Sequence, residues 1–106
     1  TRSIPAIRAF LEEHGRIVVK PLHGMGGRSI FVIAKGDPNA NVVCETLTDY
    51  GSRYAMAQRY IPEIRQGDKR IILVEGRPVG YALARVPAPD DNRGNLVAGA
   101  TPEVRP

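Results

Sequence analysis

The spacing of apolar residues along the first half of the chain predicts two helices and three strands. Residues 4–14 carry apolar side chains every three or four positions, as on the buried face of a helix, and Ser3 is a suitable N-cap. A second helix is expected over residues 40–49, with Gly51 after it as a stop signal. Short β-branched or apolar runs predict strands at residues 17–20, 29–33 and 55–60.

The second half contains two longer β-like runs and then a stretch without periodicity. The runs cover residues 68–75 and 78–86, and Gly76-Arg77 between them indicates a hairpin. Residues 87–106 are rich in Pro, Asp, Asn, Gly and Ala, which predicts a loop through to the end. Together these elements predict an α+β fold, with mostly antiparallel strands and two helices packed against them.

Composition and charge exclude several classes of protein. Charged residues make up 25% of the chain and hydrophobic residues 42%, which is typical of a globular domain. The net charge is +4, but basic residues are interspersed with acids, so no nucleic-acid partner is expected and a basic RNA-binding module is disfavoured. No apolar stretch is long enough to cross a membrane. Cys44 is the only cysteine, which excludes an internal disulfide and fits the reducing cytoplasm.

A lysine followed by a glycine-rich turn is the first candidate site. Its ammonium group supplies a point charge, and the glycines allow backbone N–H groups to approach phosphate oxygens closely. The turn is not a Walker A loop, because it lacks G-x-x-x-x-G-K-[ST]. The residues of this candidate phosphate site are Lys20, Gly24, Met25, Gly26 and Gly27. Without further context, a plain β-turn beside an exposed lysine is the commoner explanation of such a pattern.

The end of the strand expected at residues 55–60 is the second candidate site. Main-chain N–H and C=O groups there could pair with a purine ring, and Tyr60 and Ile61 could supply apolar contact. The alternative is an ordinary strand end with Tyr60 in the core.

Charged residues at the two ends of the predicted hairpin form the third candidate site. Asp68, Lys69 and Arg70 begin one strand and Arg85 ends the next. Arginine offers bidentate contacts to carboxylates and phosphates. Lys69 and Arg70 point to opposite faces of a strand, so only one can serve a given site. Arg70 and Arg85 are expected to approach one another across the hairpin, although a ladder of solvated charges is the competing interpretation.

In this order, the motifs resemble the prokaryotic glutathione synthetase family of the ATP-grasp superfamily over essentially the whole chain. The resemblance is carried by Lys20-Pro21-Leu22, Gly24-Met25-Gly26-Gly27, Glu45-Thr46-Leu47-Thr48, Met56-Ala57-Gln58, Gly67-Asp68-Lys69-Arg70, Leu83-Ala84-Arg85-Val86-Pro87 and Arg93-Gly94-Asn95-Leu96. One such string is weak evidence, whereas several in register are strong. Another ATP-grasp carboxylate–amine ligase is the neighbouring alternative, and the Arg-Gly-Asn-Leu segment favours glutathione synthetase.

The resemblance implies a ligase that joins γ-glutamylcysteine to glycine. In this family ATP phosphorylates the cysteinyl carboxylate, the glycine amine attacks the acyl phosphate, and ADP and phosphate leave, with Mg²⁺ bridging phosphates. The family's magnesium ligands would lie beyond Pro106, and a domain that helps to bind γ-glutamylcysteine would precede Thr1. Residues 1–106 are therefore expected to be a partial ATP-grasp domain that is inactive alone. Homo-oligomerisation of the full-length protein is left open.

The resemblance also assigns roles to individual residues. Nucleotide contacts fall on Lys20, Gly24, Met25, Gly26, Gly27, Gln58, Tyr60, Ile61 and Asp68, with Asp68 as the ribose-side acid. Arg70 and Arg85 resemble the arginines that contact the negative charge of the phosphate or the acyl phosphate. Arg93 belongs to a lid-like loop within residues 87–106 that folds over the substrate. His23 departs from the family, which often has an acid there, but the glycines around it are kept.

Overall fold

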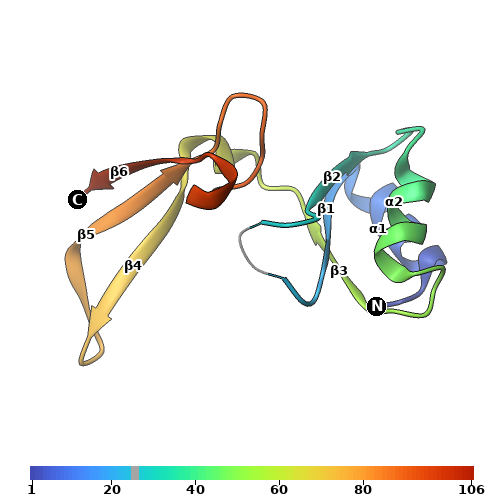
Figure 1. Ribbon diagram of the computed structural model, residues 1–106, viewed down its shortest axis with the longest axis horizontal. Helices are drawn as coiled ribbons and strands as arrows, with labels where there is room; N and C mark the ends of the chain where they lie inside the picture. The colour runs from blue at the N-terminus through green and yellow to red at the C-terminus, as the bar shows by residue number, and fades with distance from the viewer. Residues whose placement is uncertain (25–26) are drawn as a thin grey trace. The chain divides into compact units, whose positions relative to one another are not determined.

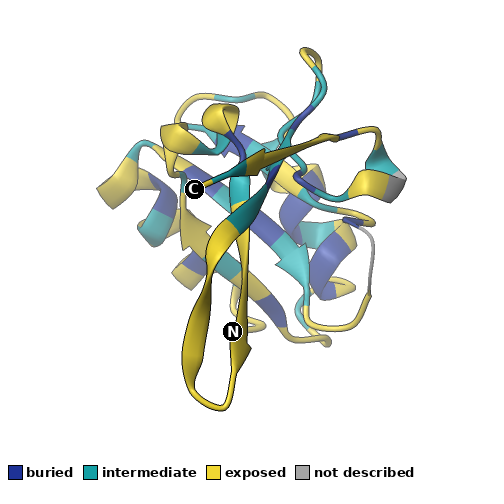
Figure 2. Ribbon diagram, turned by 90° about the vertical axis from the view of Figure 1, so that its left-hand side faces the viewer, coloured by how far each residue is buried: buried dark blue, intermediate teal, exposed yellow. Residues whose placement is uncertain are grey.

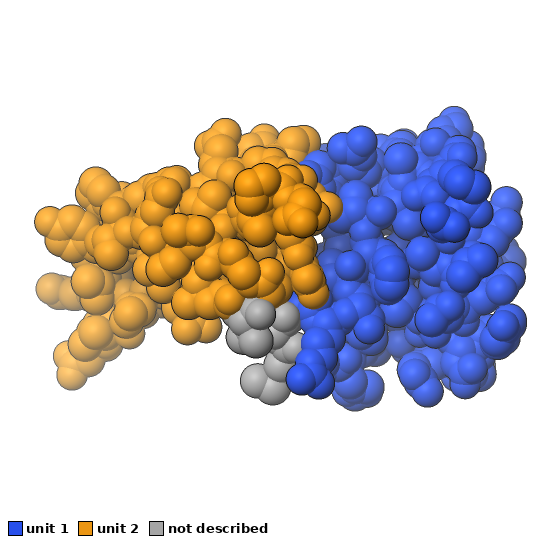
Figure 3. Space-filling view, turned by 45° about the horizontal axis from the view of Figure 1, so that its top comes forward, with its two compact units in different colours: residues 1–60 blue, residues 61–106 orange. Residues whose placement is uncertain are grey.

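The computed structural model in Figure 1 describes residues 1–24 and 27–106. The chain divides into two compact units, residues 1–60 and residues 61–106, which are coloured separately in Figure 3. Each unit contains one three-stranded antiparallel sheet, and the α-helices of the described residues belong to the first unit. The predicted α+β class is therefore confirmed.

The first unit is a small sheet with both of its helices on one face (Figure 1). Its elements are α1 (Ile4–His14), β1 (Arg16–Pro21), β2 (Phe31–Ala34), α2 (Ala40–Thr48) and β3 (Ala55–Arg59). The strand order is β2-β1-β3, so β1 is central and pairs antiparallel with both neighbours. The antiparallel pairing of β1 with β2 makes a hairpin of the two strands on either side of the glycine-rich turn.

Local signals account for the ends of α1. The Ser3 side chain accepts a hydrogen bond from the Ala6 N–H at 3.2 Å, as an N-cap does. Gly15 follows with φ 76°, and its N–H bonds to the Leu11 carbonyl, which closes the helix. The second helix ends at Thr48, one residue earlier than expected, because Asp49 adopts the left-handed conformation at φ 46°.

The core of the first unit lies between the helices and the sheet. Its buried members are Ile7, Leu11, Ile17, Val19, Ile33, Val43, Cys44, Leu47 and Ala55. Burial raises the pKa of the Cys44 thiol, which disfavours the thiolate that a nucleophilic cysteine needs. The apolar alternation of β1 thus anchors the strand that carries Lys20.

The second unit is built on a sheet of order β4-β5-β6. Its elements are the 3₁₀ turn η1 (Pro62–Gln66), β4 (Asp68–Val74), β5 (Arg77–Val86), the 3₁₀ turn η2 (Leu96–Ala98) and β6 (Thr101–Arg105). A two-residue loop joins β4 to β5, with φ 51° at Glu75 and 78° at Gly76. Positive φ at both positions is what the right-handed twist of a tight hairpin requires. The predicted hairpin is confirmed, with its turn one residue earlier than the signal.

The prediction of a loop over residues 87–106 is wrong for its last residues, where β6 forms. Thr101–Arg105 pairs antiparallel with β5, for example Arg85 with Pro102. Proline has no N–H to donate, so a segment that contains Pro102 is not predicted to be a strand from sequence. Proline is nevertheless tolerated on an edge strand such as β6. Pairing with β5, and not local periodicity, makes this segment extended.

Much of the β4–β5 hairpin is exposed (Figure 2). The side chains of Ile71, Ile72, Leu73 and Val74 are each exposed by more than half. A run of exposed apolar side chains is unusual on a surface that faces only water.

In the described part of the chain, no helix has the length and apolar character needed to span a membrane.

Candidate functional site

Lys20 and Gln58 lie on the same face of the first sheet. Ile17 and Val19 are buried on the side of the helices, so Val18 and Lys20 point to the other side. The register pairs Val18 with Gln58 and Lys20 with Met56. Lys20 and Gln58 are therefore diagonal neighbours on the face away from the helices, and such positions are roughly 7–8 Å apart.

In the turn after Lys20, the two described glycines adopt positive φ. Gly24 has φ 140° and Gly27 has φ 78°, and both values lie in a region that residues other than glycine rarely adopt. Gly24 is exposed, and a Cβ added there would meet no atom within 4 Å. Met25 and Gly26, also predicted for this loop, lie outside the described residues.

Tyr60 closes the first unit directly after β3. Its N–H donates to the Arg16 carbonyl at 3.1 Å, and the Arg16 guanidinium lies 5.3 Å from the centre of its ring. Tyr60 is half-buried rather than part of the core. Ile61, the next predicted contact, is exposed at the start of the second unit.

In the second unit, Asp68 and Arg85 form a two-point ion pair. They sit directly opposite one another in the β4–β5 register. Nε and Nη2 of Arg85 donate to Oδ1 and Oδ2 of Asp68 at 2.7 and 2.9 Å. These hydrogen bonds raise the pKa of the Arg85 guanidinium further. The pair fixes the plane of the guanidinium, because a fork-to-fork contact allows one orientation.

Arg70 shares this face of the second sheet, and Lys69 lies on the other. Arg70 is opposite Leu83, so it is the diagonal neighbour of Arg85. The register thus brings Arg70 and Arg85 together as expected, although Arg85 takes Asp68 as its ion-pair partner. Nζ of Lys69 donates to the Gly67 carbonyl at 2.7 Å.

Gly94 places the segment around Arg93 against Asp68. A Cβ built on Gly94 would lie 2.5 Å from Oδ2 of Asp68, a distance at which the two must move apart. Only glycine allows the backbone to come this close. The glycine of the Arg-Gly-Asn segment is therefore explained by packing on the Asp68–Arg85 pair.

Arg93 is held within its own loop by Asp91. Its Nε lies 2.9 Å from Oδ1 and its Nη2 2.6 Å from Oδ2 of that carboxylate. The N–H groups of Asn92 and Arg93 also donate to Oδ1. The hydrogen bonds from Arg93 are the main reason that the pKa of Asp91 falls to about 2.

Two residues of this unit, Asp91 and Arg65, were not singled out as site residues by sequence. An aspartate whose carboxylate accepts N–H groups of the next two residues is a known turn pattern, so Asp-Asn-Arg was a usable local signal. Arg65 contacts carbonyl groups more than 20 residues away in the chain, which no local signal reveals.

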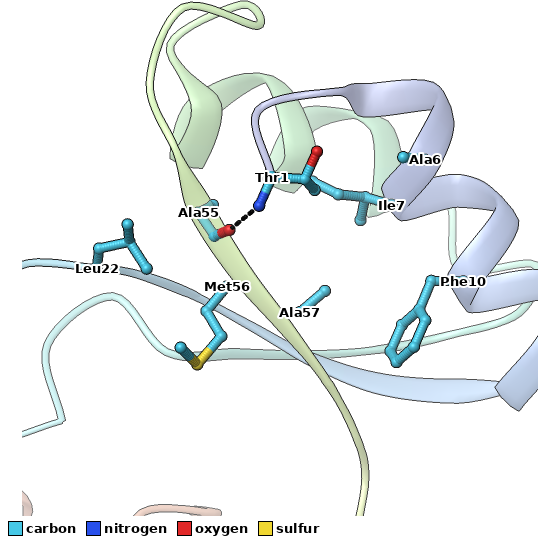
Figure 4. A pocket seen from close by; sticks show the side chains of 8 residues that line it. All are labelled: Thr1, Ala6, Ile7, Phe10, Leu22, Ala55, Met56 and Ala57. Carbon is cyan, nitrogen blue, oxygen red and sulfur yellow. Dashed lines mark hydrogen bonds between the residues drawn. The ribbon is translucent and has the colours of Figure 1, made fainter.

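A separate apolar pocket lies in the first unit beside α1 and β3 (Figure 4). Ile7, Phe10 and Met56 are among its lining residues, with Leu22 at its side. None of the described residues predicted to contact nucleotide lines it. The pocket therefore adds nothing to the candidate site.

Residues 1–106 match a protein family described as the ATP-grasp domain of prokaryotic glutathione synthetase. The chain belongs to this family. Proteins named glutathione synthetase from Vibrio parahaemolyticus, Salmonella typhimurium and Escherichia coli O157:H7 are 56%, 55% and 54% identical to it over all 106 residues. The chain spans about a third of the length of these curated relatives, 34% in each case. Within this ATP-grasp domain, Arg70 and Arg85 lie on the β4–β5 sheet, and Arg93 lies on the loop packed against it.

Proposed function

We propose that the chain is the nucleotide-binding part of a glutathione synthetase, which ligates γ-glutamylcysteine to glycine through an acyl phosphate and releases ADP and phosphate. The family match over all 106 residues carries this proposal. The exposed apolar hairpin supports it, because such a surface is expected where a larger protein covers it. The reducing cytoplasm is the location we propose, with ATP, γ-glutamylcysteine and glycine as small-molecule partners.

In the proposed complex, the first unit contacts the nucleotide through one face of its sheet. Lys20 would place its ammonium group beside the phosphates, and the turn from Gly24 through Met25 and Gly26 to Gly27 would offer N–H groups to them. Gln58, Tyr60 and Ile61 would contact the adenine from the end of β3. The common face of Lys20 and Gln58 supports this arrangement.

The second unit would supply the ribose contact and the positive charge. Each carboxylate oxygen can accept more than one hydrogen bond, so Asp68 can bind a ribose hydroxyl while it holds Arg85. Arg70, Arg85 and Arg93 would stabilise the negative charge that develops on the transferred phosphoryl group and the acyl phosphate.

Magnesium is expected with the ATP of such a ligase. Among residues 1–24 and 27–106, no three His, Cys, Asp or Glu side chains lie close enough to hold a metal ion. The described residues thus do not fit a resident magnesium site, and none of the proposed roles depends on one. Their part in the reaction is positioning and charge stabilisation.

The proposed activity is tested with the full-length ligase that contains this chain. ADP release is measured with ATP and γ-glutamylcysteine, with and without glycine. Release that requires both γ-glutamylcysteine and glycine supports the proposal. ADP release that requires a different acid or amine substrate would assign the chain to another ATP-grasp ligase. The 106-residue chain alone, assayed in parallel, is expected to be inactive.

Replacing Lys20 with alanine in the full-length ligase is expected to weaken ATP binding by about 10- to 100-fold, the usual loss for a hydrogen bond to a charged group. Calorimetric titration with a non-hydrolysable ATP analogue measures the dissociation constant. Lys35→Ala is the matched control, because Lys35 is exposed and pairs with Glu12 on α1. Equal dissociation constants for the Lys20 variant and the wild type would remove Lys20 from the site.

We propose that residues 87–99 act as a lid that closes over bound substrates. Residues 87–95 contain no helix or strand, and Pro87 is the only one of their apolar side chains that is buried, so little apolar burial offsets the entropy of ordering them. Trypsin is expected to cleave after Arg93 more slowly when ATP and γ-glutamylcysteine are bound. Cleavage after Arg53, in an exposed turn of the first unit, serves as the control. Unchanged cleavage after Arg93 would mean an ordinary connector.

A further inference from the structure

Arg65 holds the first turn of the proposed lid through main-chain carbonyl groups. It lies on η1, and its Nη1 donates to the carbonyl oxygens of Asp91 at 2.5 Å, Ala88 at 3.3 Å and Pro89 at 3.4 Å. The turn is also closed by the Asp91 N–H, which donates to the Ala88 carbonyl at 3.0 Å. One guanidinium nitrogen therefore contacts most of the carbonyl groups of a four-residue turn.

Asp91 connects this turn to Arg93. Its main-chain carbonyl is bound by Arg65, while its carboxylate binds the Arg93 guanidinium and the N–H groups of Asn92 and Arg93. A movement of the turn would therefore carry the carboxylate with it. These contacts link the position of the turn to the direction in which the Arg93 side chain leaves the loop.

The other end of the Arg93 segment is also held. Gly94 packs against the carboxylate of Asp68, which is itself bound by Arg85. Arg93 thus sits between one anchor on η1 and another on the β4–β5 sheet. The Gly94 anchor is a packing contact, whereas the Arg65 anchor consists of hydrogen bonds to the turn.

We propose that Arg65 is a positioning residue that orients Arg93 through the turn at residues 88–91 and the Asp91 carboxylate. It does not touch the reacting groups. This inference rests on the proposed function for the part that Arg93 plays in catalysis. The physical reason is preorganisation: a charge aimed correctly before the reaction costs no reordering at the transition state, and a misplacement of about 1 Å can cost up to 100-fold.

A double-mutant cycle in the full-length ligase tests whether Arg65 acts through Arg93. Arg65→Met is expected to lower kcat by about tenfold in the wild-type background and to have no further effect in the Arg93→Met background. Arg65→Lys should recover part of kcat, because an ammonium group can still donate to the turn. Arg77→Met, at the exposed start of β5, is the control for loss of one positive charge. Equal losses from Arg65→Met in both backgrounds would overturn the proposal.

Hydrogen exchange in the ligand-free ligase separates failure of this inference from failure of the proposed function. Arg65→Met is expected to speed exchange at residues 88–95 and to leave β4 unchanged. Exchange at residues 88–95 equal to that of the wild type would show that Arg65 does not hold the turn. If Arg93→Met left kcat unchanged, the catalytic part proposed for Arg93 would be wrong, and the exchange rates would still decide whether Arg65 anchors the loop.

Discussion

In the full-length ligase, Arg85→Met is expected to lower kcat/KM for ATP, measured as ADP release, by roughly 100- to 1,000-fold. This is the usual effect of removing one preorganised hydrogen-bond donor that stabilises charge developing in the transition state. Methionine keeps an unbranched side chain but loses the charge and both hydrogen bonds to Asp68. The Asp68 carboxylate then keeps its negative charge without its partner, which disfavours an anionic substrate nearby. Steady-state kinetics of ADP release, with γ-glutamylcysteine and glycine saturating, measure the change.

Two further variants separate charge from geometry at this position. Arg85→Lys retains the positive charge but cannot make the two-point contact with Asp68, so it should recover only part of the activity. Arg77→Met removes a charge at the far end of β5 and should leave kcat/KM near that of the wild type. The catalytic part proposed for Arg85 would be wrong if Arg85→Met stayed within about threefold of the wild type, a difference under 1 kcal/mol.

Ile17→Ala is expected to lower the free energy of unfolding of the first unit by about 2–5 kcal/mol. Ile17 is fully buried on the central strand β1, between the two neighbouring strands and beneath the helices. Removing three carbons there leaves a cavity that the surrounding sheet cannot fill. Urea unfolding of the 106-residue chain, followed by circular dichroism, measures the loss.

The matched control for this substitution is Ile72→Ala. Ile72 is 58% exposed on β4, so the same change in chemistry should alter the free energy of unfolding by about 0.5 kcal/mol or less. A similar loss for both variants would contradict the core derived from the burial of β1. Because Lys20 continues the same strand, loss of this core would also displace the proposed phosphate contact.

Where the signals were local, the elements of the fold followed from sequence. Ser3 caps the start of α1 as expected, and Gly15 ends the helix, because capping hydrogen bonds join residues only three or four positions apart. The β4–β5 hairpin also followed, because its turn needs residues that accept positive φ. The strand β6 did not follow from sequence, because Pro102 is untypical of a strand and only pairing with β5 supplies the hydrogen bonds of β6.

The chemistry of the candidate site divides in the same way. Residue type and order determined that Lys20 and its glycines precede a strand, that Asp68 and Arg85 stand at the ends of a hairpin, and that the chain resembles an ATP-grasp ligase. Tertiary structure alone decided that Asp68 binds Arg85 in two places and that Gly94 packs directly on that carboxylate. It alone also joined Arg65 to the turn at residues 88–91. The reason is physical: a side chain's partner is set by strand register and by backbone approach between distant segments, and neither is encoded in the spacing of residues along one segment.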